Sequence, residues 1–357
     1  MKRRIDSVPR RILCGVWRTV ILLVTVLAVF VGTVFGALRM ICSNISPAAK
    51  RVFVTTMLET GQMKFLAYLF VSSEEIRSLV NSNSLQECND AVDSSLIHIN
   101  VESEQPKNTQ EEQLTVTRIS GRTFLATMIV LRDPSSLSLA SIYPWREKGV
   151  TLDTLVKDAG AIGGINAGIY NSTNNTGGSP YGIVVCNGEI QYNRPEQFPG
   201  LVMIGLTEDN ILQIVDINGK TAAQVQSLVQ QLHIRDAIAF QEESTDANNH
   251  FVQLVINGRA REMNGMGSGL NPRTAIGQRE DGTLLLLVTD GRGRNGHLGA
   301  SAADLIDIML EYGAVNAANL DGGSSSCMYY DGAYLMDSVT FYYTNSSWRM
   351  PTAFVIH

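Results

Sequence analysis

The stretch at residues 319–332, "NLDGGSSSCMYYDG", sets one carboxylate, Asp321, before two glycines and three serines. The residues on either side, "GAVNAA" and "CMYY", have the apolar character of strands. The pattern therefore predicts a strand, a turn of small residues and a second strand, with Asp321 at the end of the first. An Asp-Gly-Gly sequence alone is more often a simple turn, so a ligand site here needs further support.

Working outward from this stretch, short strand-like runs fill the chain from Leu114 onward. They are repeatedly joined by dipeptides that tolerate the positive φ angles of two-residue hairpin turns. These are Asn187-Gly188, Asn257-Gly258, Asp281-Gly282 and Asp331-Gly332. Helices are predicted around 151–158, 221–232 and 301–312, the last with Ser301 as N-cap and Gly313 as its stop. The predicted fold class is α+β, with a mixed, mainly antiparallel sheet and a few packed helices.

An uncharged apolar run occupies residues 19–38, "TVILLVTVLAVFVGTVFGAL". As a helix it is about 30 Å long, the thickness of a bilayer core. The basic segment 1–18 before it predicts a cytoplasmic N-terminus and an extracytoplasmic remainder. A cleaved signal peptide has a shorter apolar region and an A-x-A-like site, so we favour an uncleaved, single-pass anchor in the cell membrane.

Composition divides the remaining chain into three parts. Residues 39–80 have the spacing of amphipathic helices and are predicted to form a stem that packs on the membrane or on itself. Residues 81–113 are polar and acidic, as in a flexible linker, and 114–357 form one domain.

Charge and cysteine content exclude several functions. The net charge is −6, and residues 1–18 carry six basic residues and one acidic residue, so the rest carries −11. An acidic body argues against nucleic acid as a partner. Five cysteines without a C-x-x-C pair argue against zinc or thioredoxin-like chemistry, and Cys186 and Cys327 are predicted to be buried free thiols.

The apolar run at 161–167 contains one polar side chain, Asn166, and is predicted to be a buried strand that ends on it. A buried amide must find hydrogen-bond partners, either in the local backbone or in a ligand. The following "NSTNNTGG" lacks the phosphate-loop pattern and a helix directly after it, so we expect a mobile loop.

A second cluster lies in the hairpin "NPRTAIGQREDGTLLLLVTDGR". Antiparallel pairing about Asp281-Gly282 places Arg273, followed by Thr274, at the same end as Asp290. The Arg273 guanidinium there either clamps a phosphate or carboxylate or simply pairs with Asp290.

The loop "DGRGRNGHLGAS" then adds cations before the helix at Ser301, whose N-terminus would also favour an anion. These residues are Arg292, Arg294 and His297. Arg349 precedes the last predicted strand. The backbone amides of Gly322, Gly323 and Ser324, if they point inward, would suit an oxyanion or a sugar hydroxyl.

Five segments taken in order, "INAGIYN", "GIVVCNGEI", "NPRTAIGQREDGTLLLLVTDGR", "GAVNAANLDGGSSSCMYYDG" and "RMPTAFVI", resemble the phosphodiester glycosidase family. The resemblance covers 114–357 and is closest to membrane-anchored bacterial members. It implies a hydrolase that cleaves the bond between an anomeric carbon and phosphate in a sugar-1-phosphodiester. Where relatives commonly read Asn-Gly-Gly-Tyr-Phe and Asp-Gly-Gly-Gly-Ser, this chain has Asn-Ala-Gly-Ile-Tyr from Asn166 and Asp-Gly-Gly-Ser-Ser from Asp321.

The chemistry of such a bond suggests roles for these residues. Carboxylates would face the anomeric centre, with Asp321 and Asp290 as nucleophile or base, and arginines would hold the phosphate, namely Arg273 with Arg292 or Arg349. The remaining predicted substrate-binding residues are Asn166, Thr274, Gly322, Gly323, Ser324 and Ser325. Retention and inversion both stay open. No cofactor is expected; a divalent metal at Asp321 is an open alternative, although no cluster of oxygen ligands appears.

The predicted substrate is a phosphosugar or glycopolymer of extracellular, cell-wall or exopolysaccharide metabolism. Two other functions remain open. The chain could be a non-catalytic, membrane-tethered module that binds glycopolymers with the same residues. It could also be a glycosyl or phosphoglycosyl transferase.

Overall fold

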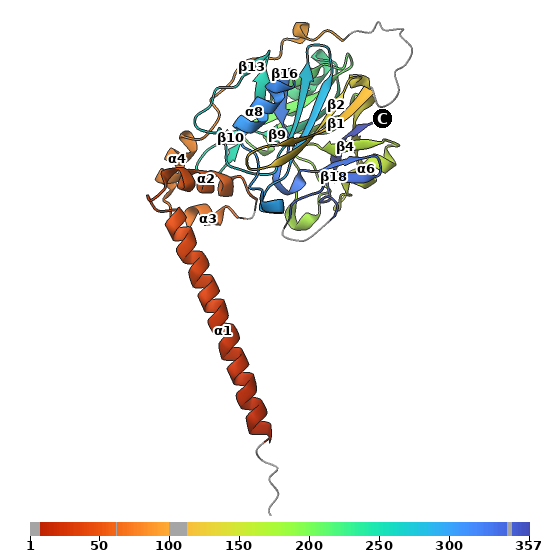
Figure 1. The fold of residues 1–357 in the computed structure, drawn as a ribbon. Helices are drawn as coiled ribbons and strands as arrows, with labels where there is room; N and C mark the ends of the chain where they lie inside the picture. The colour runs from red at the N-terminus through yellow and green to blue at the C-terminus, as the bar shows by residue number, and fades with distance from the viewer. Residues whose placement is uncertain (1–7, 62, 100–112, 341–344) are drawn as a thin grey trace, which may run out of the picture.

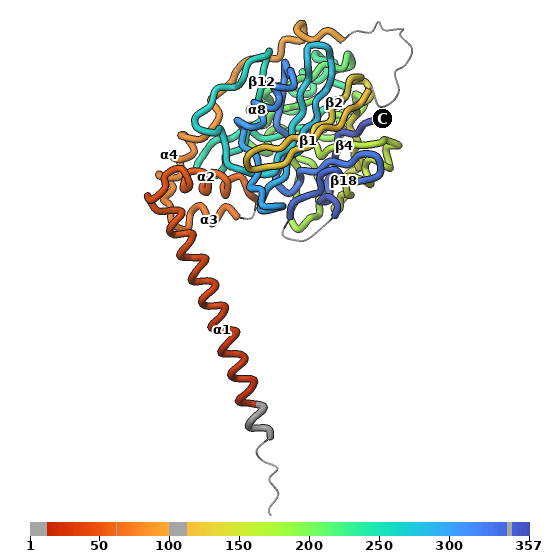
Figure 2. Tube along the Cα trace, viewed as in Figure 1, coloured from red at the N-terminus to blue at the C-terminus, as the bar shows by residue number. Residues whose placement is uncertain are grey.

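The computed structural model describes residues 8–61, 63–99, 113–340 and 345–357 of the chain. The long helix α1 (Val8–Ile41) stands out from the body, and the short helices α2 (Pro47–Leu58), α3 (Phe65–Tyr68) and α4 (Ser73–Asn81) lie at its junction with the body (Figures 1 and 2). Residues 13–41 of α1 are long and apolar enough to cross a membrane, and none of the most apolar window is buried. A helix of this kind near the N-terminus is a membrane anchor or a signal sequence.

Three sheets form the body, and every strand pair in them is antiparallel. The first has the order β1 (Leu114–Ser120), β2 (Leu125–Leu131), β15 (Leu284–Thr289), β14 (Thr274–Arg279), β16 (Ala314–Asn319), β12 (Gln253–Ile256), β13 (Arg259–Ala260). The second is β18 (Ala333–Met336), β17 (Met328–Tyr330), β4 (Gly163–Asn166), β19 (Thr352–Ile356), β3 (Leu137–Ser141). The third is β6 (Glu189–Arg194), β5 (Gly182–Cys186), β9 (Ile234–Gln241), β7 (Leu201–Thr207), β8 (Leu212–Asp216). A two-stranded ribbon joins β10 (Glu243–Ser244) to β11 (Asn249–His250), and the α+β prediction is confirmed.

The three helices predicted in the body are present, and each packs on a different sheet. They are α6 (Leu152–Asp158), α7 (Ala222–Gln231) and α8 (Ala302–Glu311). Thr221 and Ser301 complete capping boxes at the starts of α7 and α8, which satisfies amides that the first helical turn leaves unpaired. Apolar side chains from all three sheets meet in one further core between them.

Three of the four predicted tight turns have positive φ at both central residues, at Asn187-Gly188, Asn257-Gly258 and Asp331-Gly332. The turn at Asp281-Gly282 differs, because only Gly282 has positive φ and the Arg279 amide donates to the Thr283 carbonyl at 2.9 Å. That bond closes a three-residue loop, so the prediction of a two-residue turn was wrong there.

The stem packs on itself through an apolar core and also hydrogen-bonds to the body. Glu59 of the stem pairs with Arg273 of the body, and Asn83, just after the stem, donates to the carbonyl of Ser268 at 2.8 Å. Residues 81–113 were predicted to form a flexible linker, but residues 83–98 contact the body. Leu85 forms an isolated β-bridge with Met263, and the His98 amide donates to the Glu280 carbonyl. The last part of that linker, 100–112, lies outside the described residues. Cys186 and Cys327 are buried free thiols, as predicted.

Candidate functional site

A cavity of about 1540 Å³ lies between the stem and the body. One wall consists of the loops that follow β15 and β16, and the opposite wall consists of α2 and α3. This volume exceeds the 300–1,000 Å³ or so of an ordinary small-ligand pocket. We call it the site cavity.

Asp321 lines the site cavity from the end of β16, where the sequence predicted it. One of its carboxylate oxygens accepts the Gly322 amide at 3.0 Å. Burial raises the pKa of Asp321 to about 7, against the opposing effects of the Ser325 hydroxyl, the Gly322 amide and the Arg292 charge. A carboxyl with a pKa near neutrality in a cavity can exchange a proton at physiological pH.

Arg292 lies next to this loop and lines the same wall. Its Nη1 donates to Ser324 Oγ at 2.7 Å. Residue 323 must be glycine for this approach, because its φ is +64° and a Cβ would stand 2.6 Å from Arg292 Nη2. Arg292 is exposed at the cavity surface. Desolvation by the surrounding walls and the charge of Arg273 lower its pKa to about 10, so the guanidinium is still charged at neutral pH beside Asp321.

Asn166 and Thr274 lie behind the Asp321 loop and do not line the site cavity. The Asn166 side chain donates to the Asp321 carbonyl at 2.6 Å, and its oxygen accepts from Thr274 Oγ1 at 2.7 Å and from the Cys327 amide at 3.1 Å. These side-chain hydrogen bonds tie the Asp321 loop to β4 and β14. The partners of the buried Asn166 amide therefore lie within the protein.

Arg273 lines the site cavity, but its guanidinium pairs with Glu59 of the stem, not with Asp290. The same guanidinium donates to the Gly269 carbonyl at 2.9 Å and lies over the Phe251 ring, 4.8 Å from its centroid. With its charge matched by Glu59, Arg273 is less available than Arg292 to bind a phosphate.

Glu59 is a site residue that the sequence analysis missed. Its side chain is 1% exposed, and besides Arg273 its oxygens accept from the Gly269 amide at 2.7 Å and from the side chains of Asn249 and Asn271, each at 3.0 Å. Glu59 therefore fastens the stem to the body at the edge of the site cavity. No pattern in the sequence links it to residues about two hundred positions away.

Asp290 lies at the hairpin end predicted for it but does not line the site cavity. Its oxygens accept the Leu125 amide at 2.7 Å and contact His297 Nδ1 at 2.6 Å, and its side chain is 5% exposed. Asp321 and Asp290 were expected to face one reacting centre, but only Asp321 of the two lines the site cavity.

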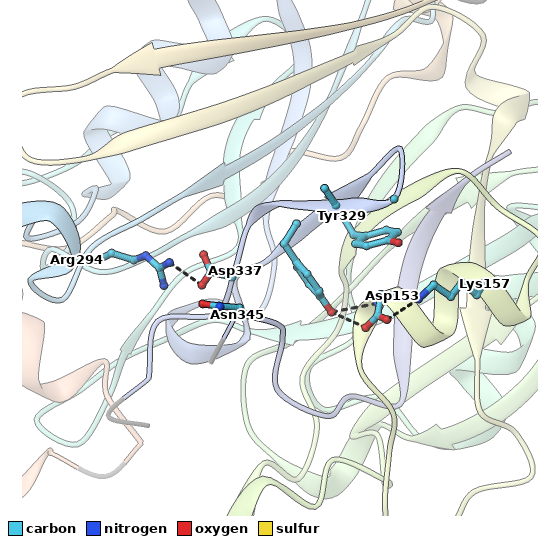
Figure 3. Close-up of a pocket in the computed structure, with 9 residues that line it drawn as sticks. Asp153, Lys157, Arg294, Tyr329, Asp337 and Asn345 are labelled. Carbon is cyan, nitrogen blue, oxygen red and sulfur yellow. Dashed lines mark hydrogen bonds and ion pairs between the residues drawn. The ribbon is translucent and has the colours of Figure 1, made fainter. Parts of the chain in front are cut away.

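Two other predicted cations also lie elsewhere. Arg349 is exposed and outside the cavity lining, and its amide donates to Asn175 at 2.8 Å. Arg294 pairs with Asp337 at 2.6 Å in a separate pocket of about 490 Å³, which Figure 3 shows. The other charges in that pocket, Lys157 and Asp153, pair with each other, so it lacks an uncompensated charge for a ligand among the residues described there.

The start of α8 does not offer the anion site that the sequence suggested. Ser301 and Asp304 cap it reciprocally, and the Ala302 amide donates to Ser268 Oγ at 2.8 Å. These bonds use the first amides of the helix within the protein.

The glycine amides of the Asp321 loop are also used internally. The Gly322 amide donates to Asp321, and that of Gly323 donates to the Pro272 carbonyl at 2.8 Å, so the prediction of free, inward-pointing amides was wrong for both. Ser324 and Ser325 do line the cavity, and the Ser325 hydroxyl lies 3.0 Å from the hydroxyl of Tyr170.

His250 is a second lining residue that the sequence analysis missed. Burial, together with the charges of Lys64 and Arg273, lowers the pKa of His250 to about 3, so the imidazole is neutral.

Within the described parts of the chain, no three His, Cys, Asp or Glu side chains converge as a metal site requires.

The fold resembles that of a solved structure. A structure titled zebrafish N-acetylglucosamine-1-phosphodiester alpha-N-acetylglucosaminidase catalytic domain, auto-inhibited by pro-peptide, matches with a TM-score of 0.53 and 16% identity, over 68% of this chain and 82% of that one. A hypothetical protein from Synechocystis matches with a TM-score of 0.43 and 18% identity, over 68% of this chain and 61% of that one.

Sequence comparisons identify a relative and a family. An uncharacterized SPbeta prophage-derived protein of Bacillus subtilis (strain 168), YomE, is 45% identical over 65 residues, which are 18% of this chain. The match spans only 10% of that relative's length. The family described as phosphodiester glycosidase matches residues 159–357, more than half of the chain. The chain therefore belongs to the phosphodiester glycosidase family.

Proposed function

We propose that this protein hydrolyses a sugar-1-phosphodiester in the site cavity, between the anomeric carbon and the phosphate. The observation that carries the proposal is the pair formed by Asp321, with its pKa of about 7, and the charged Arg292 on the same wall. Family membership supports hydrolysis of a phosphodiester glycosidic linkage.

The reaction needs opposite charges at two points. Its transition state resembles an oxocarbenium ion at the sugar and gathers negative charge on the departing phosphate. In our proposal the ionised Asp321 acts at the anomeric carbon, as a nucleophile or as the base that activates water. Arg292 neutralises the phosphate, and the hydroxyls of Ser324 and Ser325 bind its oxygens or those of the sugar.

The other predicted residues have supporting roles in this proposal. Asn166 and Thr274 position the Asp321 loop through the hydrogen bonds described above. Arg273 adds positive potential beside Arg292, while Asp290 orders the loop that carries Arg292. Arg349 has no assigned role.

The proposal includes a location. Segment 1–18 lies in the cytoplasm, 19–38 spans the cell membrane, and the stem 39–80 and segment 81–113 lead to an extracytoplasmic catalytic domain at 114–357. The apolar helix α1 supports this arrangement. Glycopolymers of the cell wall or exopolysaccharide would supply the diester outside the cytoplasm.

The test uses the purified full chain and soluble sugar-1-phosphodiesters, with free reducing sugar and phosphomonoester as the measured products. We expect both products in equal amounts, and the anomer formed first, observed by NMR, distinguishes retention from inversion. Binding of the diesters without either product would instead support the glycopolymer-binding module. A product in which an added alcohol replaces water would support the transferase.

A further inference from the structure

The site cavity combines charged groups with a long apolar surface. The body contributes Asp321 and Arg292 together with apolar side chains such as Phe240. The stem contributes Glu59 and Lys64, but most of its wall is apolar and includes Ile41, the last residue of α1, with Val52, Phe53, Met57 and Leu66. A sugar phosphate would contact the charged groups and leave this apolar wall uncovered.

The apolar wall is one face of α2. Ala49, Val52, Phe53 and Thr56 line the cavity at the i, i+3, i+4, i+7 spacing of a helix face. Val54 and Leu58 of the same helix belong to the internal core of the stem, and Phe53 and Met57 pack against that core while also lining the cavity. Ala49 and Val52 line the cavity without belonging to that core.

This wall also lies next to the end of α1. Helix α2 starts at Pro47, six residues after α1 ends at Ile41, and Figure 1 shows α2 and α3 beside that end. Large apolar side chains are exposed there: Ile45 is 74%, Phe65 58% and Leu69 46% exposed. Exposed apolar residues next to a membrane-spanning helix suit the bilayer interface, which would place the stem side of the cavity at the membrane.

We propose that the substrate is a lipid-linked sugar-1-phosphodiester, whose hydrocarbon chain lies along the cavity-facing side of α2 while its sugar and phosphate lie at Asp321 and Arg292. This inference rests on the proposed function and on α1 as a membrane anchor. The cavity of about 1540 Å³ has room for a sugar phosphate and part of a chain. Each methylene buried there would strengthen binding roughly fourfold.

The reaction balances without a cofactor. The oxygen of water bonds to the anomeric carbon, and the bond from that carbon to the phosphate oxygen breaks. The lipid phosphate leaves with the electron pair, and the water proton passes to Asp321 or to solvent. The free sugar diffuses away, while the lipid monophosphate stays in the bilayer.

The test compares two diesters of the same sugar-1-phosphate, one with a hexadecyl and one with a methyl group, using the full chain in phosphatidylcholine vesicles. We expect kcat/KM to be about a hundredfold higher for the hexadecyl diester, the effect of burying only three or four methylenes. Partition into the vesicle also raises the local concentration of the hexadecyl diester. The preference is therefore tested with variants.

Val52→Asn puts an amide on the apolar wall and should lower kcat/KM for the hexadecyl diester about tenfold, and that for the methyl diester by much less. Val116→Asn, the same change on the exposed surface of β1 outside the cavity, is the matched control and should alter neither. Equal turnover of the two diesters, or a hexadecyl preference that Val52→Asn leaves intact, overturns this inference alone. No turnover of either diester overturns the proposed function and this inference with it.

Discussion

The strand ends of β15 and β16 each present an aspartate followed by glycine, and the structure gives the two carboxylates different surroundings. Asp290, after β15, is held by the Leu125 amide and His297 and is shut off from the cavity. Asp321, after β16, lines the cavity, and its pKa is raised to about 7. The same local sequence pattern thus produces one carboxylate that the body encloses and one that is placed at the cavity, where we propose that it reacts.

The strongest way to break this comparison is Asp321→Asn. The amide keeps the shape of the side chain but cannot act as a nucleophile or base, so we expect turnover of a sugar-1-phosphodiester to fall on the order of a thousandfold. Release of reducing sugar measures the effect, with circular dichroism as the check on folding. Unchanged turnover in a folded Asp321→Asn variant would remove Asp321 from the chemistry.

Arg292→Gln should have the next largest effect. The substitution removes the charge that we assign to the departing phosphate, and a lost charge-assisted contact in the transition state corresponds to about a hundredfold in kcat/KM. Arg349→Gln is the matched control, because Arg349 is exposed outside the cavity. Equal losses in both variants would contradict the role of Arg292.

The pH dependence sharpens the comparison further. If the ionised Asp321 is required, kcat/KM should rise about tenfold per pH unit below 7 and level off above it. The Arg292 charge favours ionisation, so Arg292→Gln should move the midpoint to higher pH. A midpoint that stays in place in Arg292→Gln would show that another group controls the rate.

Asp290→Asn should affect activity least of the three substitutions. We expect less than a tenfold change in kcat/KM, since Asp290 does not line the cavity. One buried hydrogen bond is lost, at a cost of about 1–2 kcal/mol, so the melting temperature should drop by a few degrees. A thousandfold loss of activity in Asp290→Asn without a lower melting temperature would instead give Asp290 the same importance for the reaction as Asp321.

Asp321→Asn should lower activity but raise stability at neutral pH, and the effect on stability should be the smaller of the two. The folded-state pKa of Asp321, about 7, lies above the unfolded value of about 3.9, so its contribution to stability is full below pH 4 and is lost as the pH rises to 7. Asp321→Asn cannot ionise, and its melting temperature relative to the native chain should therefore rise between pH 4 and pH 8. A difference independent of pH would contradict the raised pKa.

Local sequence signals predicted much of the fold. The helices starting at Thr221 and Ser301 follow from capping residues, and the Asn-Gly turns follow from residues that accept positive φ. The site was predicted in part. Asp321 and Arg292 line one cavity, but Glu59 and His250 could not be found, because nothing near them in sequence marks their partners.

The sequence by itself determined the family, the antiparallel α+β class, the apolar N-terminal helix and the loop around Asp321, because each depends on residues close together in the chain or on a family pattern. Only the tertiary structure decided which charges remain available. Arg273 is matched by Glu59 from the stem, and Asp290 is enclosed by Leu125 and His297. The physical reason is that desolvation and pairing depend on every group around a charge, and those groups come from distant parts of the chain.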